Sequence, residues 1–128
     1  MDERLRTMAL SDGRYAPEAY RFLLEGLEQA IQMTGRGDLE GKERHVTGQD
    51  VLDGLIAHGR RCFGPLTAQV WRSWGVHEPL DWGRCVFVMI DASLLSRQES
   101  DTIEDFRSRL DFDREFVEGY RVEPPAEL

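Results

Sequence analysis

The amino-acid sequence predicts a mainly α-helical domain of the α+β type, a compact helical domain with one small β-hairpin. Three observations support this fold class. Apolar side chains recur three and four residues apart in several stretches, a spacing that places them on one face of a helix. Proline or glycine stands at the expected ends of these stretches. The 128 residues, 41% of them hydrophobic, suit a single domain, whose ordered core we expect over about residues 14–120.

The first predicted helix begins near Pro17, because proline suits the first helical turn. Its apolar face consists of Tyr20, Leu23, Leu24, Leu27 and Ile31. Gly35 is a natural end for this helix, since glycine readily adopts the left-handed conformation found after helices. Residues 1–14 are polar and end in a turn signal, so we do not assign them to the core.

A second helix is predicted from Thr47, whose hydroxyl can cap it while Asp50 completes a pattern like a capping box. Its apolar stripe consists of Val51, Leu52, Leu55, Ile56, Cys62 and Phe63. Gly64 and Pro65 end this helix and start a short third one, which stops at Gly75.

A fourth helix is predicted after Pro79. Residues 85–90 are apolar on every side, and this block taken alone also fits a buried strand. We favour a helix because apolar positions continue at i+4 spacing as far as Leu94 and Leu95. A helix that is apolar all round belongs in the middle of a core.

Residues 95–97 and 102–104 flank a polar turn, and we expect them to form the hairpin. Helices followed by a hairpin resemble a winged helix-turn-helix, with the third and fourth helices in the helix-turn-helix positions. An irregular helical bundle is the alternative. A C-terminal amphipathic segment, expected to be a broken helix, carries Phe106, Leu110, Phe112, Phe116 and Tyr120. The proline-containing tail beyond it has no reason to fold.

The charge of the chain is unevenly distributed. The net charge is −8, and residues 99–128 carry 10 acidic and 4 basic side chains, a net of −6. DNA and RNA are polyanions whose binding depends on neutralised phosphates, so this balance argues against general nucleic-acid binding. A phosphate-binding patch would need Arg60, Arg61, Arg72 and Arg84 on one face. The acidic C-terminal surface is instead a candidate docking site for a basic partner.

Few residues have a spacing that indicates catalysis or metal binding. His58 and Cys62 are four residues apart and share a helix face, a spacing that zinc sites and thiol catalysts both use. Cys85, His45 and His77 are the further candidate ligands, but no paired metal-binding motif accompanies them. We therefore expect no cofactor, no metal and no catalytic residue, with His58 and Cys62 as the alternative for a small metalloprotein or enzyme.

The location of the protein can also be predicted. No run of about 18 apolar residues is present, so we expect no membrane span. The first residues lack the layout of a secretory signal. Two cysteines inside apolar runs indicate a reducing compartment rather than a disulfide scaffold. We expect a cytoplasmic protein.

Three tryptophans within twelve positions are the most informative feature for binding. Trp71 and Trp74 are three residues apart, so both can lie on one side of the third helix. Tryptophan is most often a core residue, but an exposed one beside an arginine is a typical hot spot of a protein interface. The candidate binding residues are Arg72, Trp74, Trp82 and Arg84.

Several short motifs resemble a small bacterial family of conserved hypothetical proteins, found mainly in planctomycetes and verrucomicrobia. They are Arg14-Tyr15, Ala19-Tyr20, Arg44-His45-Val46-Thr47-Gly48, Phe63-Gly64-Pro65-Leu66, Ser73-Trp74-Gly75-Val76, Asp81-Trp82-Gly83 and Asp105-Phe106. The resemblance covers about residues 14–117. It implies a freestanding, helical, cytoplasmic domain, and it implies no activity, because the family has none assigned. Asp81, which belongs to one of these motifs, has a physical role that does not depend on the resemblance, since a carboxylate in a first helical turn stabilises the helix dipole.

The sequence thus predicts a non-catalytic protein-interaction or regulatory module whose partner is another protein, with self-association into a homo-oligomer left open. A winged-helix DNA-binding regulator is the first alternative, and a metalloprotein or enzyme using His58 and Cys62 is the second.

Overall fold

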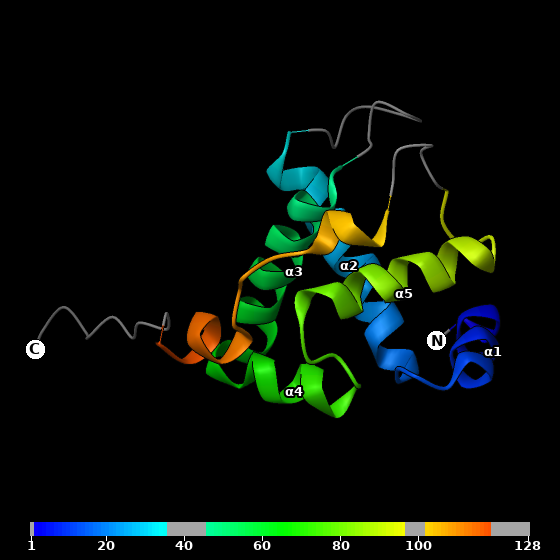
Figure 1. Cartoon of the computed structure of the whole chain (residues 1–128), viewed down its shortest axis with the longest axis horizontal. Coiled ribbons are helices and arrows are strands. Elements are labelled where there is room, and N and C mark those ends of the chain that lie inside the picture. Colours follow the sequence, from blue (N-terminus) through cyan, green and yellow to red (C-terminus); the bar gives the residue numbers. More distant parts are fainter. Residues whose placement is uncertain (1, 36–45, 97–101, 119–128) are drawn as a thin grey trace, which may run out of the picture.

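The computed structural model describes residues 2–35, 46–96 and 102–118, and it is mainly helical, which confirms the mainly α-helical part of the predicted class. Within these residues the α-helices are α1 (Glu3–Asp12), α2 (Pro17–Met33), α3 (Gly48–Phe63), α4 (Thr67–Ser73) and α5 (Pro79–Asp91) (Figure 1). Shorter helical turns are η2 (Gly64–Leu66), η3 (Ile103–Phe106) and η4 (Arg114–Glu118).

The centre of the fold is the pair formed by α2 and α3, which run side by side in opposite directions (Figure 1). Two glycines let the helices approach closely. A Cβ atom added at Gly54 would lie 2.5 Å from the carbonyl oxygen of Gly26 and 2.7 Å from the backbone nitrogen of Ala30. A Cβ atom added at Gly26 would lie 2.4 Å from Cδ2 of the Leu55 side chain. Any larger side chain at these positions pushes the two helices apart.

The ends of these helices follow local rules that were visible in the sequence. Pro17 stands in the first turn of α2. Thr47 caps α3 by accepting a hydrogen bond from the backbone N–H of Asp50, and the Asp50 carboxylate accepts one from the N–H of Thr47. The predicted capping box is therefore confirmed. At the far end of α3, the buried hydroxyl of Thr67 donates to the carbonyl oxygen of Gly59 at 2.8 Å, which ties α4 to α3.

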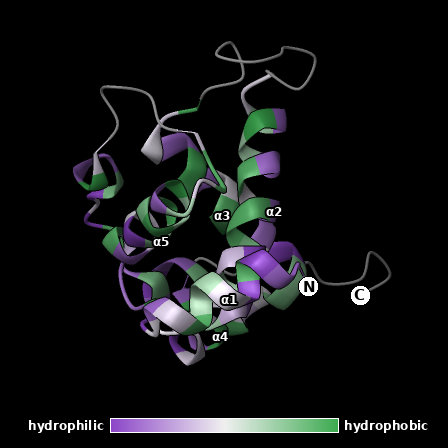
Figure 2. Ribbon diagram, turned by 90° about the vertical axis from the view of Figure 1, so that its right-hand side faces the viewer, coloured by the Kyte–Doolittle hydropathy of each residue, from purple (hydrophilic) through white to green (hydrophobic). Residues whose placement is uncertain are grey.

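Aromatic side chains fill the core between α2, α4, α5 and the C-terminal turn. Trp71 and Trp82 are fully buried, and their rings meet edge to face with centroids 5.1 Å apart. Phe112 and Phe116 cover Trp71 from the C-terminal segment, at 4.8 Å and 5.0 Å. Such edge-to-face contacts add to the free energy gained by burying the rings. In Figure 2 the ribbons of α2 and α5 alternate between hydrophobic and hydrophilic segments, as helices with one apolar face do.

The block at residues 85–90 lies within α5, so it is helical, as we favoured. The helix is shorter than predicted, because it ends at Asp91 instead of continuing to Leu95. Ser93 adopts a left-handed conformation with φ of 60°, and the N–H of Leu94 donates back to the carbonyl oxygen of Met89 at 2.8 Å. A left-handed residue ends a helix even where the apolar pattern continues past it.

The predicted hairpin is not supported, since the described ranges contain no β-strand; the expected turn at residues 98–101 lies outside them. Thr102 instead caps the helical turn η3, with its N–H donating to the Asp105 carboxylate at 2.8 Å. Phe106 at the end of η3 is buried against Gly83 of α5. A side chain at residue 83 would occupy the space of that ring. The cap and this contact favour a helical turn over a second strand.

The N-terminal residues also differ from the prediction, because the core begins before residue 14. Asp2 caps α1 through the backbone N–H of Arg4, and Gly13 ends the helix in a left-handed conformation with φ of 77°. Leu5 and Ala9 on this helix are buried. Two buried apolar residues are too few to produce a clear helical periodicity in a polar sequence, so the sequence did not predict this helix.

Candidate functional site

A surface hollow of about 440 Å³ lies between the α1–α2 connection and the end of α4. Two of the four predicted binding residues, Arg72 and Trp74, line it together. The side chains that shape it are Leu10, Arg14, Tyr15, Pro17, Arg72 and Trp74. The hollow is open to solvent, with room for one or two side chains of a partner rather than an enclosed small molecule.

Two backbone features hold the walls of the hollow together. The N–H of Ala16 donates to the carbonyl oxygen of Trp74 at 3.0 Å, which joins the α1–α2 connection to the end of α4. Gly75 has a φ of 96°, a conformation that side chains disfavour, and a Cβ atom there would lie 2.7 Å from the carbonyl oxygen of Arg14. Glycine is therefore required for the chain to pass this close to the wall.

Trp74 supplies a half-buried aromatic surface. Its ring packs against Phe22 and Phe63, with centroid distances of 5.4 Å and 6.0 Å. These contacts fix its orientation, while the remainder of the side chain stays accessible beside the hollow. Leu10, 64% exposed, lines the same hollow. A rigid aromatic group and an exposed leucine in one hollow are a suitable surface for an apolar side chain of a partner.

Tyr15 is held by a buried network behind the hollow. Its hydroxyl donates to the Asp81 carboxylate at 2.6 Å, and Arg84 donates to the same oxygen at 2.8 Å. The other oxygen of Asp81 accepts the backbone N–H groups of His77 at 2.9 Å and Glu78 at 3.2 Å. Asp81 thus accepts four hydrogen bonds and connects the α1–α2 connection to the first turn of α5.

The network also sets the protonation states of its members. Burial opposes ionisation of Asp81, but the hydrogen bonds from Tyr15, His77, Arg84 and Glu78 outweigh it and lower the pKa of this carboxyl group. Burial and the neighbouring carboxylate raise the pKa of Tyr15. The carboxylate is therefore charged and the phenol protonated at neutral pH. In these states the Tyr15 hydroxyl remains a hydrogen-bond donor to Asp81, and this bond holds the side of the hollow that Tyr15 lines.

The charge of the hollow contrasts with that of the chain. Among the described residues, those that line it include Arg14 and Arg72 and no acidic side chain, although the net charge of the protein is −8. Arg14 pairs with Asp12 at 3.1 Å, and Arg72 pairs with Asp113 at 2.8 Å. Both arginines are partly exposed and retain donors that the single partner carboxylate does not use.

The other two predicted binding residues lie elsewhere. Trp82 is fully buried and does not line the hollow, so it is a core residue in this structure and cannot contact a partner directly. Arg84 lies behind Tyr15, on Asp81, and acts on the hollow only through that network. Leu10, Arg14 and Tyr15 were not among the predicted binding residues. The only signal for them was the Arg14-Tyr15 motif within the family resemblance.

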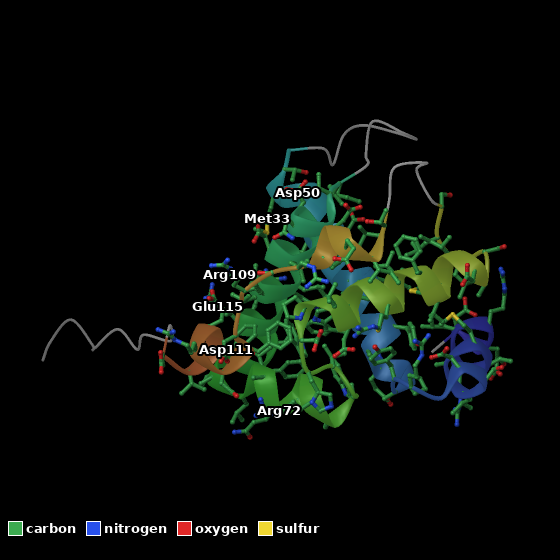
Figure 3. The ribbon with its side chains drawn as sticks, viewed as in Figure 1. Met33, Asp50, Arg72, Arg109, Asp111 and Glu115 are labelled. Carbon is green, nitrogen blue, oxygen red and sulfur yellow. The ribbon has the colours of Figure 1, made fainter. Side chains whose placement is uncertain are left out.

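The arginines that could have formed a phosphate-binding face are engaged within the protein. Arg60 pairs with Glu115, Arg72 with Asp113 and Arg84 with Asp81. Arg61 donates to Gln29 at 2.8 Å and to His58 at 3.0 Å. In Figure 3 Arg72 projects from α4 near the C-terminal segment that carries Asp111 and Glu115. The basic and acidic features that the sequence presented as separate surfaces thus partly neutralise one another.

His58 and Cys62 lie close together, but their geometry does not activate the thiol. Arg61 donates to His58 Nδ1, so Nδ1 is an acceptor and the proton is on Nε2, which faces Glu25 Oε1 at 2.8 Å. Both ring nitrogens are therefore occupied. The sulfur of Cys62 lies at 3.8 Å from Nδ1 and 3.7 Å from Nε2, which is not the alignment of a thiol with one free nitrogen.

Cys62 also differs from the prediction in its burial, since it is exposed rather than part of the apolar stripe. Cys85 is buried, as predicted, and burial raises the pKa of its thiol. No group of three or more histidine, cysteine and acidic side chains suited to a metal ion occurs in the described part of the chain. His45, one of the candidate ligands, lies outside that part.

Comparisons with family models, curated proteins and solved structures found no match to this chain. The resemblance to a bacterial family of hypothetical proteins therefore stays a prediction. The winged-helix topology is not supported, because the hairpin on which it was based has no strand among the described residues. Across the residues described, none of the helices combines the length and the apolar composition needed to cross a membrane. The candidate site consequently depends on geometry and charge alone.

Proposed function

We propose that this protein is a non-catalytic interaction module that binds an acidic segment of a partner protein, anchored by an apolar side chain, in the hollow beside Trp74. The observation that carries the proposal is the combination of a rigid, half-buried tryptophan, an exposed leucine and two arginines in a depression whose described lining has no acidic residue. An apolar anchor would pack between Trp74 and Leu10. Carboxylates of the same segment would meet Arg14 and Arg72.

The physical basis is that of a small hot spot. Tryptophan and arginine contribute most to protein interfaces because they combine a large apolar surface with strong polar contacts. Trp74 loses little conformational freedom on binding, since Phe22 and Phe63 already hold it. The support for this proposal over the DNA-binding alternative is that Arg60 and Arg84, which lie outside the hollow, pair with Glu115 and Asp81 of the same chain.

The test is a selection of peptides from a random display library on the immobilised full chain, followed by calorimetric titration of the selected peptides. The informative variant is Leu10→Ser, because Leu10 is 64% exposed and its replacement spares the core. Leu66→Ser is the matched control, since Leu66 is 56% exposed and does not line the hollow. We expect acidic peptides with one large apolar residue, weakened about tenfold by Leu10→Ser and unchanged by Leu66→Ser.

Charge reversal provides a second, independent variant. Arg72→Glu removes one cation from the rim and introduces repulsion toward an acidic peptide. Its effect on binding should decline at high salt, because exposed charges are screened. Selected peptides that bind Leu10→Ser and Arg72→Glu as tightly as the original chain would overturn the proposal.

A further inference from the structure

We propose that the binding surface continues from the hollow along residues 107–111, and that the partner segment lies extended there with a further carboxylate on Arg109. This inference rests on the proposed function, because it describes the rest of the site that binds the same partner. Residues 107–111 join η3 to η4, and we call them the η3–η4 connection. In Figure 1 the connection crosses the molecule as plain ribbon between these two helical turns.

Two further hollows lie next to the first one, because each shares lining residues with its neighbour. A second hollow of about 470 Å³ shares Arg72 with the first and is also lined by His77, Arg109 and Leu110. A third hollow of about 240 Å³ shares Arg109 and Leu110 with the second and is also lined by Leu80 of α5. The three hollows therefore form one groove, which separates the η3–η4 connection from the chain that leads out of α4 into α5.

The backbone of the η3–η4 connection can pair with an extended peptide. Arg107 has extended dihedral angles, with φ of −64° and ψ of 128°, and Gln49 of α3 holds this end by donating to the Arg107 carbonyl oxygen at 3.1 Å. The backbone N–H and C=O groups of Ser108 and Arg109 have no hydrogen-bond partner within the described part of the chain, and both residues are exposed. Exposed, extended chains with unused backbone groups bind peptides through main-chain hydrogen bonds.

Arg109 supplies an unpaired cation in this groove. It is exposed and makes no ion pair or hydrogen bond with any residue that the structure describes. The acidic side chains of the second hollow are already engaged, since Asp113 accepts from Arg72 at 2.8 Å and Asp111 accepts the backbone N–H groups of Asp113 at 2.9 Å and Arg114 at 3.3 Å. A carboxylate of the partner can therefore meet the Arg109 guanidinium without breaking an existing ion pair.

These features define the form of the partner segment. Five extended residues span roughly 16 Å, so about five residues of the partner run along the η3–η4 connection. Successive side chains of an extended chain point to opposite sides, so every second one faces the groove. The partner segment is therefore extended, with an apolar anchor beside Trp74 and, at a fixed separation from it, a carboxylate that meets Arg109.

The experiment is a double-mutant cycle on the full chain, with the tightest-binding peptide from the display selection as the probe. Arg109→Gln removes the unpaired cation, and Arg4→Gln is the matched control, because Arg4 is also exposed and lines none of the three hollows. Each acidic residue of the peptide is replaced in turn by its amide, and calorimetry measures every affinity. We expect Arg109→Gln to weaken the original peptide about fivefold, the upper range for an exposed ion pair. One amide-substituted peptide should bind Arg109→Gln and the original chain equally well, and Arg4→Gln should alter no affinity.

A second measurement tests the backbone pairing. In ¹H–¹⁵N NMR spectra, the selected peptide should move the amide resonances of Ser108 and Arg109 and leave that of Arg4 in place. A shortened peptide that keeps the residues around the apolar anchor should still bind in the hollow and should leave the Ser108 and Arg109 resonances where they are. These resonances should not depend on protein concentration in the absence of peptide, because the proposed occupant is a partner and not a second copy of this chain.

Three outcomes contradict the inference: equal effects of Arg109→Gln and Arg4→Gln, unmoved Ser108 and Arg109 resonances, or resonances that move with protein concentration and so assign the groove to a second copy. Its failure can be separated from failure of the proposed function. If peptide binding depends on Leu10 and not on Arg109, only the extension along the groove is wrong. If it depends on Arg109 and not on Leu10, the proposed function is wrong. If it depends on neither, both are wrong.

Discussion

Replacing Asp81 with asparagine tests whether the network behind the hollow stabilises the fold as its geometry indicates. Asparagine has nearly the same shape but keeps only one acceptor oxygen. If that oxygen faces Tyr15 and Arg84, the amide group points at the backbone N–H groups of His77 and Glu78, and both of those hydrogen bonds are lost. A hydrogen bond to a charged group contributes about 1.5–3 kcal/mol. We therefore expect Asp81→Asn to lower the free energy of unfolding by about 3 kcal/mol, the lower end of that sum.

Asp50→Asn is a matched control, because Asp50 occupies the same third position of a capping box in α3. Among the described residues, its carboxylate accepts the backbone N–H of Thr47, at 3.0 Å and near the surface. Losing this single bond should cost about 0.5–1 kcal/mol. Urea unfolding followed by circular dichroism measures both variants, and the midpoint should fall with little change in the slope.

The pH dependence of the free energy of unfolding tests the direction of the Asp81 pKa shift. Because the pKa of Asp81 is lowered in the folded protein, its contribution is complete above the pKa of an unfolded aspartate, about 4, and is lost as the pH falls through the lower folded value. The difference between the original chain and Asp81→Asn should be constant from about pH 7 to pH 5 and should shrink below about pH 4. The reasoning is refuted if Asp81→Asn costs no more than Asp50→Asn, or if the difference widens in acid.

Three further predictions concern the thiols and the glycines. A thiol reagent should modify Cys62 rapidly in the folded protein and Cys85 only after unfolding, and equal reaction rates would contradict the described burial. Gly54→Ala should lower the free energy of unfolding by about 3 kcal/mol, since the added methyl group meets the backbone of α2. Thermal unfolding measures this effect, and an unchanged melting temperature would mean that the two helices can move apart at no cost. Gly75→Ala places a side chain at a left-handed φ and against the Arg14 carbonyl oxygen, so it should weaken both peptide binding in the hollow and the stability of the fold. Calorimetry that shows an unaltered peptide affinity would contradict the role given to this wall of the hollow.

Much of the helical framework could be predicted because its signals are local. Pro17 and Thr47 mark helix starts through rules that involve only the next few residues, and Gly75 marks an end in the same way. The end of α5 was predicted wrongly because the apolar pattern gave no local signal for it. The apolar pattern continued to Leu95, whereas a single left-handed residue, Ser93, ended the helix.

The candidate site was only partly predictable. Arg72 and Trp74 could be identified as a pair because they stand at the end of one short helix, Arg72 in its last turn and Trp74 directly after it, where neighbours in sequence reach neighbouring surfaces. Trp82 was grouped with them from spacing alone, although it lies in the core. Leu10 and Arg14 could not be identified, since their role depends on α1 and its connection being placed against the end of α4.

The helical class, the positions of most helix ends and the acidic balance of the chain follow from the sequence alone, because hydrophobic periodicity and helix caps depend on residues close together in the chain and composition depends on no contact at all. Which tryptophan is accessible and which charges are paired depends on the tertiary structure. Tyr15 meets Asp81 across 66 positions, and Arg72 meets Asp113 across 41. No local rule encodes contacts at such separations, since they arise when the aromatic core brings distant elements together to exclude water.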